Sequence, residues 1–166
     1  MKQTSRYEGL QKNIKVLKTP EIEVWENQYP DKAYTISLAI PEFTCICPKT
    51  GLPDFADIKI EYSPQKFCIE LKSFKLYTIF YRDIGIFHEH VVNRMLEDFV
   101  RAAQPRWARI MGVFNPRGGI TTTVIREYWP QEPAGRQWFG SSSQSHKPVR
   151  QWFGSSSQSH KPEKHK

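Results

Sequence analysis

One short stretch decides how this chain is organised, and it reads Thr44-Cys45-Ile46-Cys47-Pro48-Lys49-Thr50-Gly51-Leu52-Pro53-Asp54-Phe55-Ala56. It contains two prolines, a glycine, two cysteines and one carboxylate. Proline restricts the backbone, and Gly and Pro-Asp are typical of turns, so the stretch predicts a rigid turn. A rigid turn holds its side chains still. That would be useful if Cys47 is a nucleophile and Asp54 is the proton donor beside it.

The segments on both sides of this turn have the alternating pattern of β-strands. Residues 34–40 alternate, and we expect Pro41 to end that strand. Residues 55–62 alternate as well, with an apolar face from Ile58 to Tyr62 and an opposite face of charged residues. This pattern is typical of a half-buried antiparallel strand with one face in water.

Two helices are expected after the strands. Residues 73–81 form the first candidate, with Ser73 as a plausible N-cap. Between 87 and 103 the apolar residues recur with the spacing of an amphipathic helix, and Pro105 stops it.

A second strand pair completes the predicted fold. Residues 107–114 and 120–126 are strand-like, and 115–119 predict a tight hairpin turn between them. A short extended piece at 67–71 and loops over 1–30 account for the remainder. Strand pair, helices and strand pair together predict an α+β fold, with helices on one face of an antiparallel sheet.

Composition favours one folded domain, which we place at residues 1–133. The 166 residues are 39% hydrophobic and 13% aromatic, enough for a core. The polar N-terminus predicts no signal peptide, and no apolar run is long enough to span a membrane. Three cysteines without a secretion signal then predict reduced thiols and a cytoplasmic protein.

The C-terminal segment, 134–166, has a different character. Residues 136–148 recur unchanged at 150–162, a tandem 14-residue repeat of Gly, Ser and Gln with Trp and Phe as its apolar residues. We expect a disordered tail. It carries +5 of the net charge of +7, so the folded part is nearly neutral. Two interpretations stay open: an arm that touches a partner or RNA, and a duplication without a role.

Cys47 and Asp54 each allow an ordinary interpretation and a functional one. A cytosolic cysteine is most often an inert buried residue, and a nucleophile needs a lowered thiol pKa. Asp54 could simply stabilise the turn, and a general acid needs a pKa raised by burial. Cys45 lies on the same face of an extended backbone as Cys47. Cys-x-Cys lacks the spacing of a common zinc motif, which weakens a metal interpretation without removing it.

Charged residues elsewhere suggest partners for that turn. His88 and Glu89 open the second helix, where a glutamate favours the helix dipole but a protonated histidine does not. Lys72 and Lys75 are either solvated lysines or a phosphate clamp. The turn at Arg117 adds a fork-shaped donor that supports the clamp.

These motifs together resemble the short form of the NADPH-dependent 7-cyano-7-deazaguanine reductases, the nitrile reductases of queuosine biosynthesis. The resemblance covers roughly residues 33–126, and it lies in Pro41-Glu42-Phe43-Thr44, Cys47-Pro48, Thr50-Gly51, Pro53-Asp54-Phe55-Ala56, Glu70-x-Lys72-Ser73-x-Lys75-Leu76-Tyr77, Phe87-His88-Glu89 and Pro116-Arg117-Gly118-Gly119-Ile120. It implies the tunnelling fold, in which subunits join edge to edge into a barrel with active sites between them. It also implies a homo-oligomer, a decamer of two stacked pentamers.

The resemblance also implies a role for each motif. The catalytic residues would be Cys47, which adds to the nitrile to form a thioimide, Asp54, which handles the proton, and His88. Substrate would be bound by Glu89, Glu70 and His88. The cofactor NADPH, needed twice per turnover, would be bound by Lys72, Ser73, Lys75, Arg117 and Gly118. No metal is expected. No G-x-G-x-x-G is present, so the nicotinamide cofactor would not be held by a Rossmann unit.

Three positions depart from the family's pattern: Val91 stands where some relatives have a second cysteine, Cys45 where serine is usual, and Leu52 where glutamine is common. Two other functions remain open from the sequence. One is a zinc-dependent GTP cyclohydrolase of the same fold, which needs a Cys/His/Cys metal set. The other is an RNA-binding module with a basic tail, although the folded part is nearly neutral.

Overall fold

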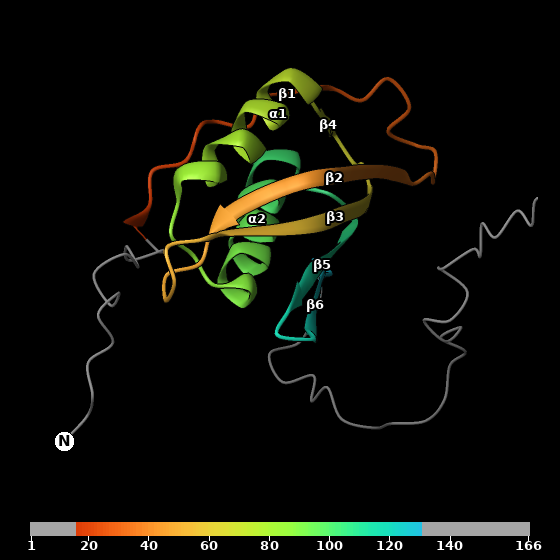
Figure 1. The fold of residues 1–166 in the computed structure, drawn as a ribbon. Helices are drawn as coiled ribbons and strands as arrows, with labels where there is room; N and C mark the ends of the chain where they lie inside the picture. Colours follow the sequence, from red (N-terminus) through yellow and green to blue (C-terminus); the bar gives the residue numbers. More distant parts are fainter. Residues whose placement is uncertain (1–15, 131–166) are drawn as a thin grey trace, which may run out of the picture. The chain divides into compact units, whose positions relative to one another are not determined.

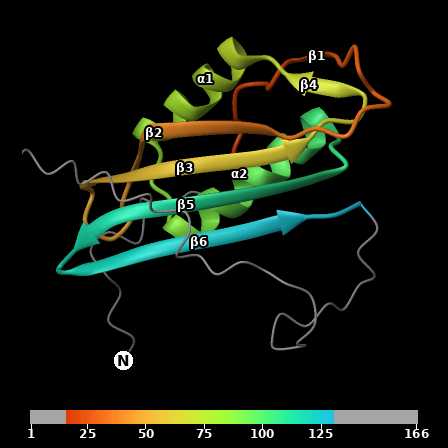
Figure 2. The ribbon, with the colours of Figure 1, turned by 90° about the vertical axis from the view of Figure 1, so that its right-hand side faces the viewer.

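The structure is a computed structural model that describes residues 16–130 of the 166-residue chain. Its centre is a four-stranded antiparallel sheet in the order β2-β3-β5-β6 (Figures 1 and 2). The strands are β2 (Ile36–Ile46), β3 (Pro53–Ser63), β5 (Trp107–Arg117) and β6 (Ile120–Tyr128). Two short strands, β1 (Val24–Glu26) and β4 (Phe67–Ile69), form a separate pair.

Both helices pack against one face of the sheet. They are α1 (Leu71–Phe80), which continues into the short 3₁₀ turn η2 (Tyr81–Asp83), and α2 (His88–Ala103). The apolar face predicted for residues 55–62 is buried beneath them, from Ile58 to Tyr62. The charged residues between these positions point to the other face, where Lys59 pairs with Glu61 at 3.1 Å. The predicted α+β layer is therefore confirmed.

Pro41 does not end its strand, so that prediction was wrong. β2 continues to Ile46 and contains a β-bulge. Ile40 pairs with Ile58 and Phe43 pairs with Ala56, so β2 has one residue more than β3 between these two pairs. Because β2 is an edge strand and the bulge unpairs this region, the missing N–H of proline leaves no ladder partner unsatisfied. The longer strand carries the chain directly into the cysteine turn.

The N-cap of α1 is Glu70, and the prediction of Ser73 was wrong. Glu70 has an extended backbone, and its carboxylate accepts hydrogen bonds from the amides of Lys72 at 2.7 Å and Ser73 at 2.6 Å. These bonds lower the pKa of Glu70. Ser73 lies inside the helix, where its hydroxyl donates to the Glu70 carbonyl and accepts from the amide of Glu23.

The second helix follows its prediction closely. It begins at His88 and ends at Ala103, and Gln104 adopts a left-handed conformation with φ 46° before Pro105. The last hairpin is tighter than expected, because β5 runs to Arg117 and only Gly118 and Gly119 turn, both with positive φ. Two consecutive glycines suit the turn that connects twisted strands.

Some predictions fall outside the described residues. Residues 1–15 and the predicted tail, 134–166, with its repeat, are among them. The loops predicted for residues up to 30 include one strand, β1, which pairs with β4. Within residues 16–130, none of the helices is both long and apolar enough to cross a membrane.

Candidate active site

The pairing of β2 with β3 brings the turn residues together. Cys45 lies opposite Asp54 and Ile46 lies opposite Pro53. Two backbone bonds close the turn beyond them, from the Cys47 amide to the Leu52 carbonyl and from the Gly51 amide back to Cys47, both at 2.9 Å. The predicted turn is therefore confirmed, and its geometry comes from the register of two long strands.

Cys47 is half-buried and its thiol pKa is lowered. Burial alone raises the pKa of this thiol, and the nearby charge of Asp54 raises it as well. The hydroxyl of Thr50 and the amides of Lys49 and Thr50 hydrogen-bond the sulfur and outweigh both effects. Donors aimed at a sulfur stabilise the thiolate, which is the nucleophilic form. Lys49 contributes through its amide, and its side chain is exposed.

Cys45 has the opposite character. It is fully buried, and burial raises its thiol pKa to about 12. It remains protonated at neutral pH and weakly approaches the Ile86 carbonyl, at 3.9 Å. Cys45 is therefore a small packing residue of the core.

Asp54 lies in β3, where its side chain is 5% exposed and its two oxygens face different partners. Oδ2 lies 3.2 Å from Nε2 of His88, and Oδ1 lies 2.5 Å from Nε of Arg117. A buried carboxylate with two such donors is fixed in orientation. Asp54 therefore does more than stabilise a turn.

His88 reaches Asp54 because the loop before α2 is tied to the end of β2. Ile46 forms a parallel bridge with Gly85, in which the Ile46 amide donates to Ile84 and its carbonyl accepts from Ile86, both at 3.0 Å. α2 begins directly after this bridge, so its first residue faces the turn.

The ring of His88 is also held from its face. It stacks on buried Phe114 of β5, with ring centroids 3.7 Å apart and planes 7° from parallel. Its Nε2 points to Asp54. Stacking together with this polar contact fixes both the plane and the direction of the imidazole.

Arg117 ends β5, and pairing of β5 with β3 places it beside the turn. Figure 2 shows the two turns, β2–β3 and β5–β6, at the same end of the sheet. Gly118 follows with φ +56°, and a Cβ built there meets nothing within 4 Å. The structure thus brings Cys47, Asp54, His88 and Arg117 into one cluster, which we call the turn cluster.

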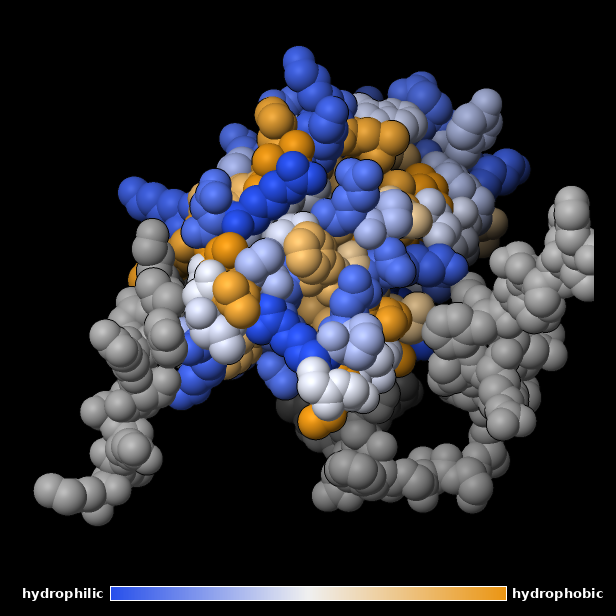
Figure 3. All heavy atoms as spheres, in the orientation of Figure 1, coloured by the Kyte–Doolittle hydropathy of each residue, from blue (hydrophilic) through white to orange (hydrophobic). Residues whose placement is uncertain are grey.

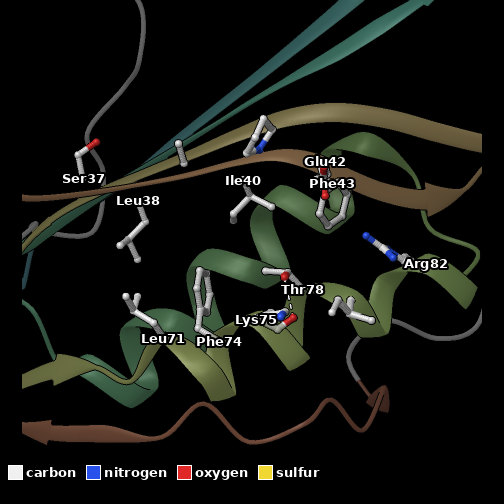
Figure 4. Close-up of a pocket in the computed structure, with 13 residues that line it drawn as sticks. Ser37, Leu38, Ile40, Glu42, Phe43, Leu71, Phe74, Lys75, Thr78 and Arg82 are labelled. Atoms are coloured by element: carbon white, nitrogen blue, oxygen red, sulfur yellow. Dashed lines mark hydrogen bonds between the residues drawn. The ribbon is translucent and has the colours of Figure 1, made fainter.

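The other predicted residues lie along α1. Lys72 and Lys75 are exposed, whereas the hydroxyl of Ser73 and both oxygens of Glu70 are used in the helix cap. Lys75 borders a groove of about 450 Å³ between α1 and β2, lined chiefly by apolar residues such as Leu38, Ile40 and Phe74 (Figure 4). Apolar residues also reach the outer surface over α1, as Figure 3 shows.

Glu89 lies outside both the turn cluster and the set of predicted residues along α1. It occupies the first turn of α2, next to His88, and its side chain is exposed. Its carbonyl accepts a hydrogen bond from Asn93 at 2.7 Å. An exposed carboxylate beside the turn cluster is free to accept hydrogen bonds from a bound molecule.

Two residues of the site received no role from the sequence. Thr50 could have been found, because a threonine three residues after the nucleophile in a turn is placed to bond back toward it. Phe114 could not, because only the sheet brings it to His88, 26 positions away in the chain.

A metal set of the kind a zinc enzyme needs does not form within residues 16–130. Cys47 and His88 approach the same carboxylate, but no group of three or more His, Cys, Asp or Glu in this range is placed to hold an ion.

Comparison with known proteins gives consistent results. A family model described as QueF-like protein matches residues 53–133. The NADPH-dependent 7-cyano-7-deazaguanine reductase of Halorhodospira halophila is 54% identical over 107 residues, which are 64% of this chain and 91% of that protein. The protein of the same name from Nitrosomonas europaea is 48% identical over 131 residues, 76% of this chain and 94% of that protein.

A solved structure confirms the fold. The crystal structure of an archaeosine synthase QueF-Like in the apo form matches with a TM-score of 0.54 and 22% identity, covering 60% of this chain and 96% of its own. The antiparallel sheet with two helices is therefore an α+β fold of the tunnelling type, as predicted.

Proposed function

The chain belongs to the NADPH-dependent 7-cyano-7-deazaguanine reductases, and on this ground we propose that it reduces the nitrile of 7-cyano-7-deazaguanine to the aminomethyl group of 7-aminomethyl-7-deazaguanine. This is a step of queuosine biosynthesis, the modification of tRNA. The observation that carries the proposal is the turn cluster, in which a cysteine of lowered pKa lies beside a buried carboxylate. We expect the activity in the cytoplasm, where thiols stay reduced.

The chemistry begins with Cys47. Its sulfur attacks the nitrile carbon, a C–S bond forms, and one π bond of the nitrile becomes the lone pair of the nitrogen. The proton that the thiol gives up passes through Asp54 to that nitrogen, so the product is a covalent thioimide with no net change in charge. His88, which shares the Asp54 carboxylate, helps to deliver the proton.

NADPH supplies hydride when bound, and two hydrides are needed to take a nitrile to an amine. Lys72 and Lys75 suit its phosphates because they are exposed cations one helical turn apart on α1. The α1 amides do not suit an anion, because Glu70 already accepts from those of Lys72 and Ser73. Of the α1 residues predicted to bind the cofactor, the two lysines are therefore the ones that fit.

Glu89 is the residue we assign to the guanine-like edge of the substrate. A carboxylate accepts two N–H donors side by side, which matches that edge. Glu89 is exposed and directly follows His88, so a molecule bound to it also reaches the turn cluster. Glu70, the other carboxylate predicted to bind substrate, uses both of its oxygens in the cap of α1.

We further propose that the enzyme is a homo-oligomer with sites shared between subunits, as in a decamer of two pentamers. Lys75 lines the same groove as Ile40 (Figure 4), whereas Cys47 follows Ile46, the last residue of β2. Seven extended residues separate Ile40 from Cys47, a distance of roughly 20 Å along the strand. Within the described residues, β2 and β6 each pair on one side only. A neighbouring subunit joined at these edges would bring its own lysines to the turn cluster.

The test follows substrate and cofactor together. Purified protein mixed with 7-cyano-7-deazaguanine should form a covalent adduct on Cys47, seen by intact mass spectrometry. With NADPH present, two NADPH should be oxidised for each amine formed. A Cys47→Ala protein that still turned over would overturn the covalent mechanism. Zinc bound in stoichiometric amount, with no NADPH consumed, would overturn the reductase assignment in favour of the cyclohydrolase.

A further inference from the structure

Arg117 directs every nitrogen of its guanidinium at residues 50–54, which form the end of the turn and the start of β3. Nε pairs with Oδ1 of Asp54 at 2.5 Å. Nη1 donates to the Thr50 hydroxyl at 3.2 Å, and Nη2 donates to the carbonyls of Pro53 at 2.5 Å and Leu52 at 3.5 Å. One side chain therefore spans the turn from the residue that hydrogen-bonds Cys47 to the proposed acid.

The hydroxyl of Thr50 is the link between Arg117 and the nucleophile. It accepts hydrogen bonds from Nη1 of Arg117 and from the amide of Leu52 at 3.3 Å. A hydroxyl has two lone pairs and one proton, so both acceptor positions are then filled. The Thr50 hydroxyl also lowers the pKa of the Cys47 thiol, so we assign its remaining O–H to the sulfur of Cys47.

We propose that Arg117 is a positioning residue for the first chemical step, because its guanidinium holds the Asp54 carboxylate directly and aims the Thr50 proton at the Cys47 sulfur. This assignment rests on the proposed function and adds to it, because the family resemblance implies only a role in binding the cofactor. A guanidinium suits the task, since its rigid fork can join three partners at once.

The two roles of Arg117 are separable because adduct formation consumes no NADPH. A residue that only binds the cofactor leaves the reactivity of Cys47 unchanged. A residue that positions Thr50 and Asp54 alters that reactivity before any cofactor is added. Lys72 and Lys75 provide the matched controls, because they are exposed cations on α1, whereas the turn joins β2 and β3.

The first measurement is the rate at which iodoacetamide alkylates Cys47 at neutral pH, with no substrate present. We expect Arg117→Ala and Thr50→Val to slow it about three- to tenfold, the effect of one lost hydrogen bond to a thiolate. At a pH above the thiol pKa of every variant, the rates should converge. Lys72→Ala and Lys75→Ala should match the wild type at each pH.

The second measurement is the rate of adduct formation with 7-cyano-7-deazaguanine and no NADPH. Arg117→Ala should slow adduct formation more than it slows alkylation, because the variant also lacks the ion pair with Asp54. Arg117→Lys should retain part of that rate, since one ammonium can pair with Asp54 but cannot also reach Thr50 and the carbonyls. Lys72→Ala should form adduct normally and show a raised KM for NADPH.

Wild-type rates of alkylation and adduct formation in Arg117→Ala, with only the KM for NADPH raised, would overturn the proposal. If Arg117→Ala does not fold, as circular dichroism would show, Thr50→Val and Arg117→Lys decide the matter by the same two rates. A wild-type protein that forms no adduct at all would overturn the proposed function instead. The alkylation rates would still test the role of Arg117.

Discussion

At the scale of single residues, the two cysteines of the turn differ because of their surroundings. Thr50 and two amides lower the pKa of Cys47, which is half-buried. Cys45, two positions earlier, is enclosed by the core and cannot lose its proton at moderate pH. This difference in thiol pKa distinguishes a nucleophile from a packing residue, because the thiolate is the form that reacts.

We therefore predict that iodoacetamide modifies the folded protein at Cys47 alone. Cys45 and Cys68 are both buried, so they should react only after unfolding in urea. Because the pKa of Cys47 is lowered from 9.0, its thiolate fraction rises at lower pH than that of a free thiol, and the alkylation rate should reach half its maximum below pH 9. Peptide mass mapping identifies the site. Equal labelling of Cys45 under native conditions would contradict the burial described.

At the scale of elements, a buried acid joins the two helices and the chain before them. Asp98 of α2 accepts hydrogen bonds from Arg94 at 2.8 Å, from Tyr77 of α1 at 3.0 Å and from Thr19 at 3.3 Å. Exposed Arg101 adds a contact at 2.9 Å. The helices therefore pack through a satisfied polar cluster as well as through apolar side chains.

Removing the centre of that cluster should destabilise the protein strongly. Asp98→Ala removes the carboxylate that Arg94 and the buried Tyr77 hydroxyl share, and we expect a loss of about 3 kcal/mol in the free energy of unfolding. Chemical denaturation monitored by fluorescence measures this. Arg101→Ala is the control and should cost at most about 1 kcal/mol, because that side chain is 69% exposed. Similar losses for the two variants would show that Asp98 is not the centre.

At the scale of the whole molecule, the predicted site is divided. The turn cluster lies at one end of the sheet, and the lysines of α1 lie along the groove toward the other end of β2. Both edge strands of the described sheet have an unpaired side. An assembly of several copies would pair the open edges of the sheet and bring the two parts of the site together.

Mixed oligomers test this division. Cys47→Ala and Lys75→Ala should each have little activity at limiting NADPH. When the two are co-expressed, about a quarter of the interfaces should combine an intact cysteine with an intact lysine, so activity should return to about a quarter of the wild-type value. Light scattering reports whether the chain assembles. Assembly without any recovery would place both residues in the site of one subunit.

The basic C-terminal segment should be separable from catalysis. Deleting residues 136–166 removes +5 of the net charge of +7, and the match to the family model ends at residue 133. We expect the shortened protein to keep its kcat and KM and to elute from heparin at lower salt, because fewer cations then contact the polyanion. Loss of activity from a folded shortened protein would instead give the segment a role.

How much the sequence could predict depends on the range of the interactions. The turn, the alternating strands and the amphipathic α2 follow from neighbouring residues, and each was predicted. The ends of β2 and the cap of α1 were not. Pro41 is tolerated because β2 is an edge strand and has a bulge at this position. Glu70, and not Ser73, caps α1 because the backbone of Glu70 is extended. Such features depend on pairing and backbone conformation that residue type does not specify.

The sequence by itself determined the family, the order of the long strands and the helices, and the candidate residues for the chemistry, because local pattern and residue type are sufficient for these. Only the tertiary structure decided how the surroundings of Cys47 and Cys45 differ, which partners hold Asp54 and where Arg117 points. These depend on burial and on contacts between residues far apart in the chain, such as Arg117 with Thr50 and His88 with Phe114. Burial and such contacts exist only once the sheet and the helices have packed.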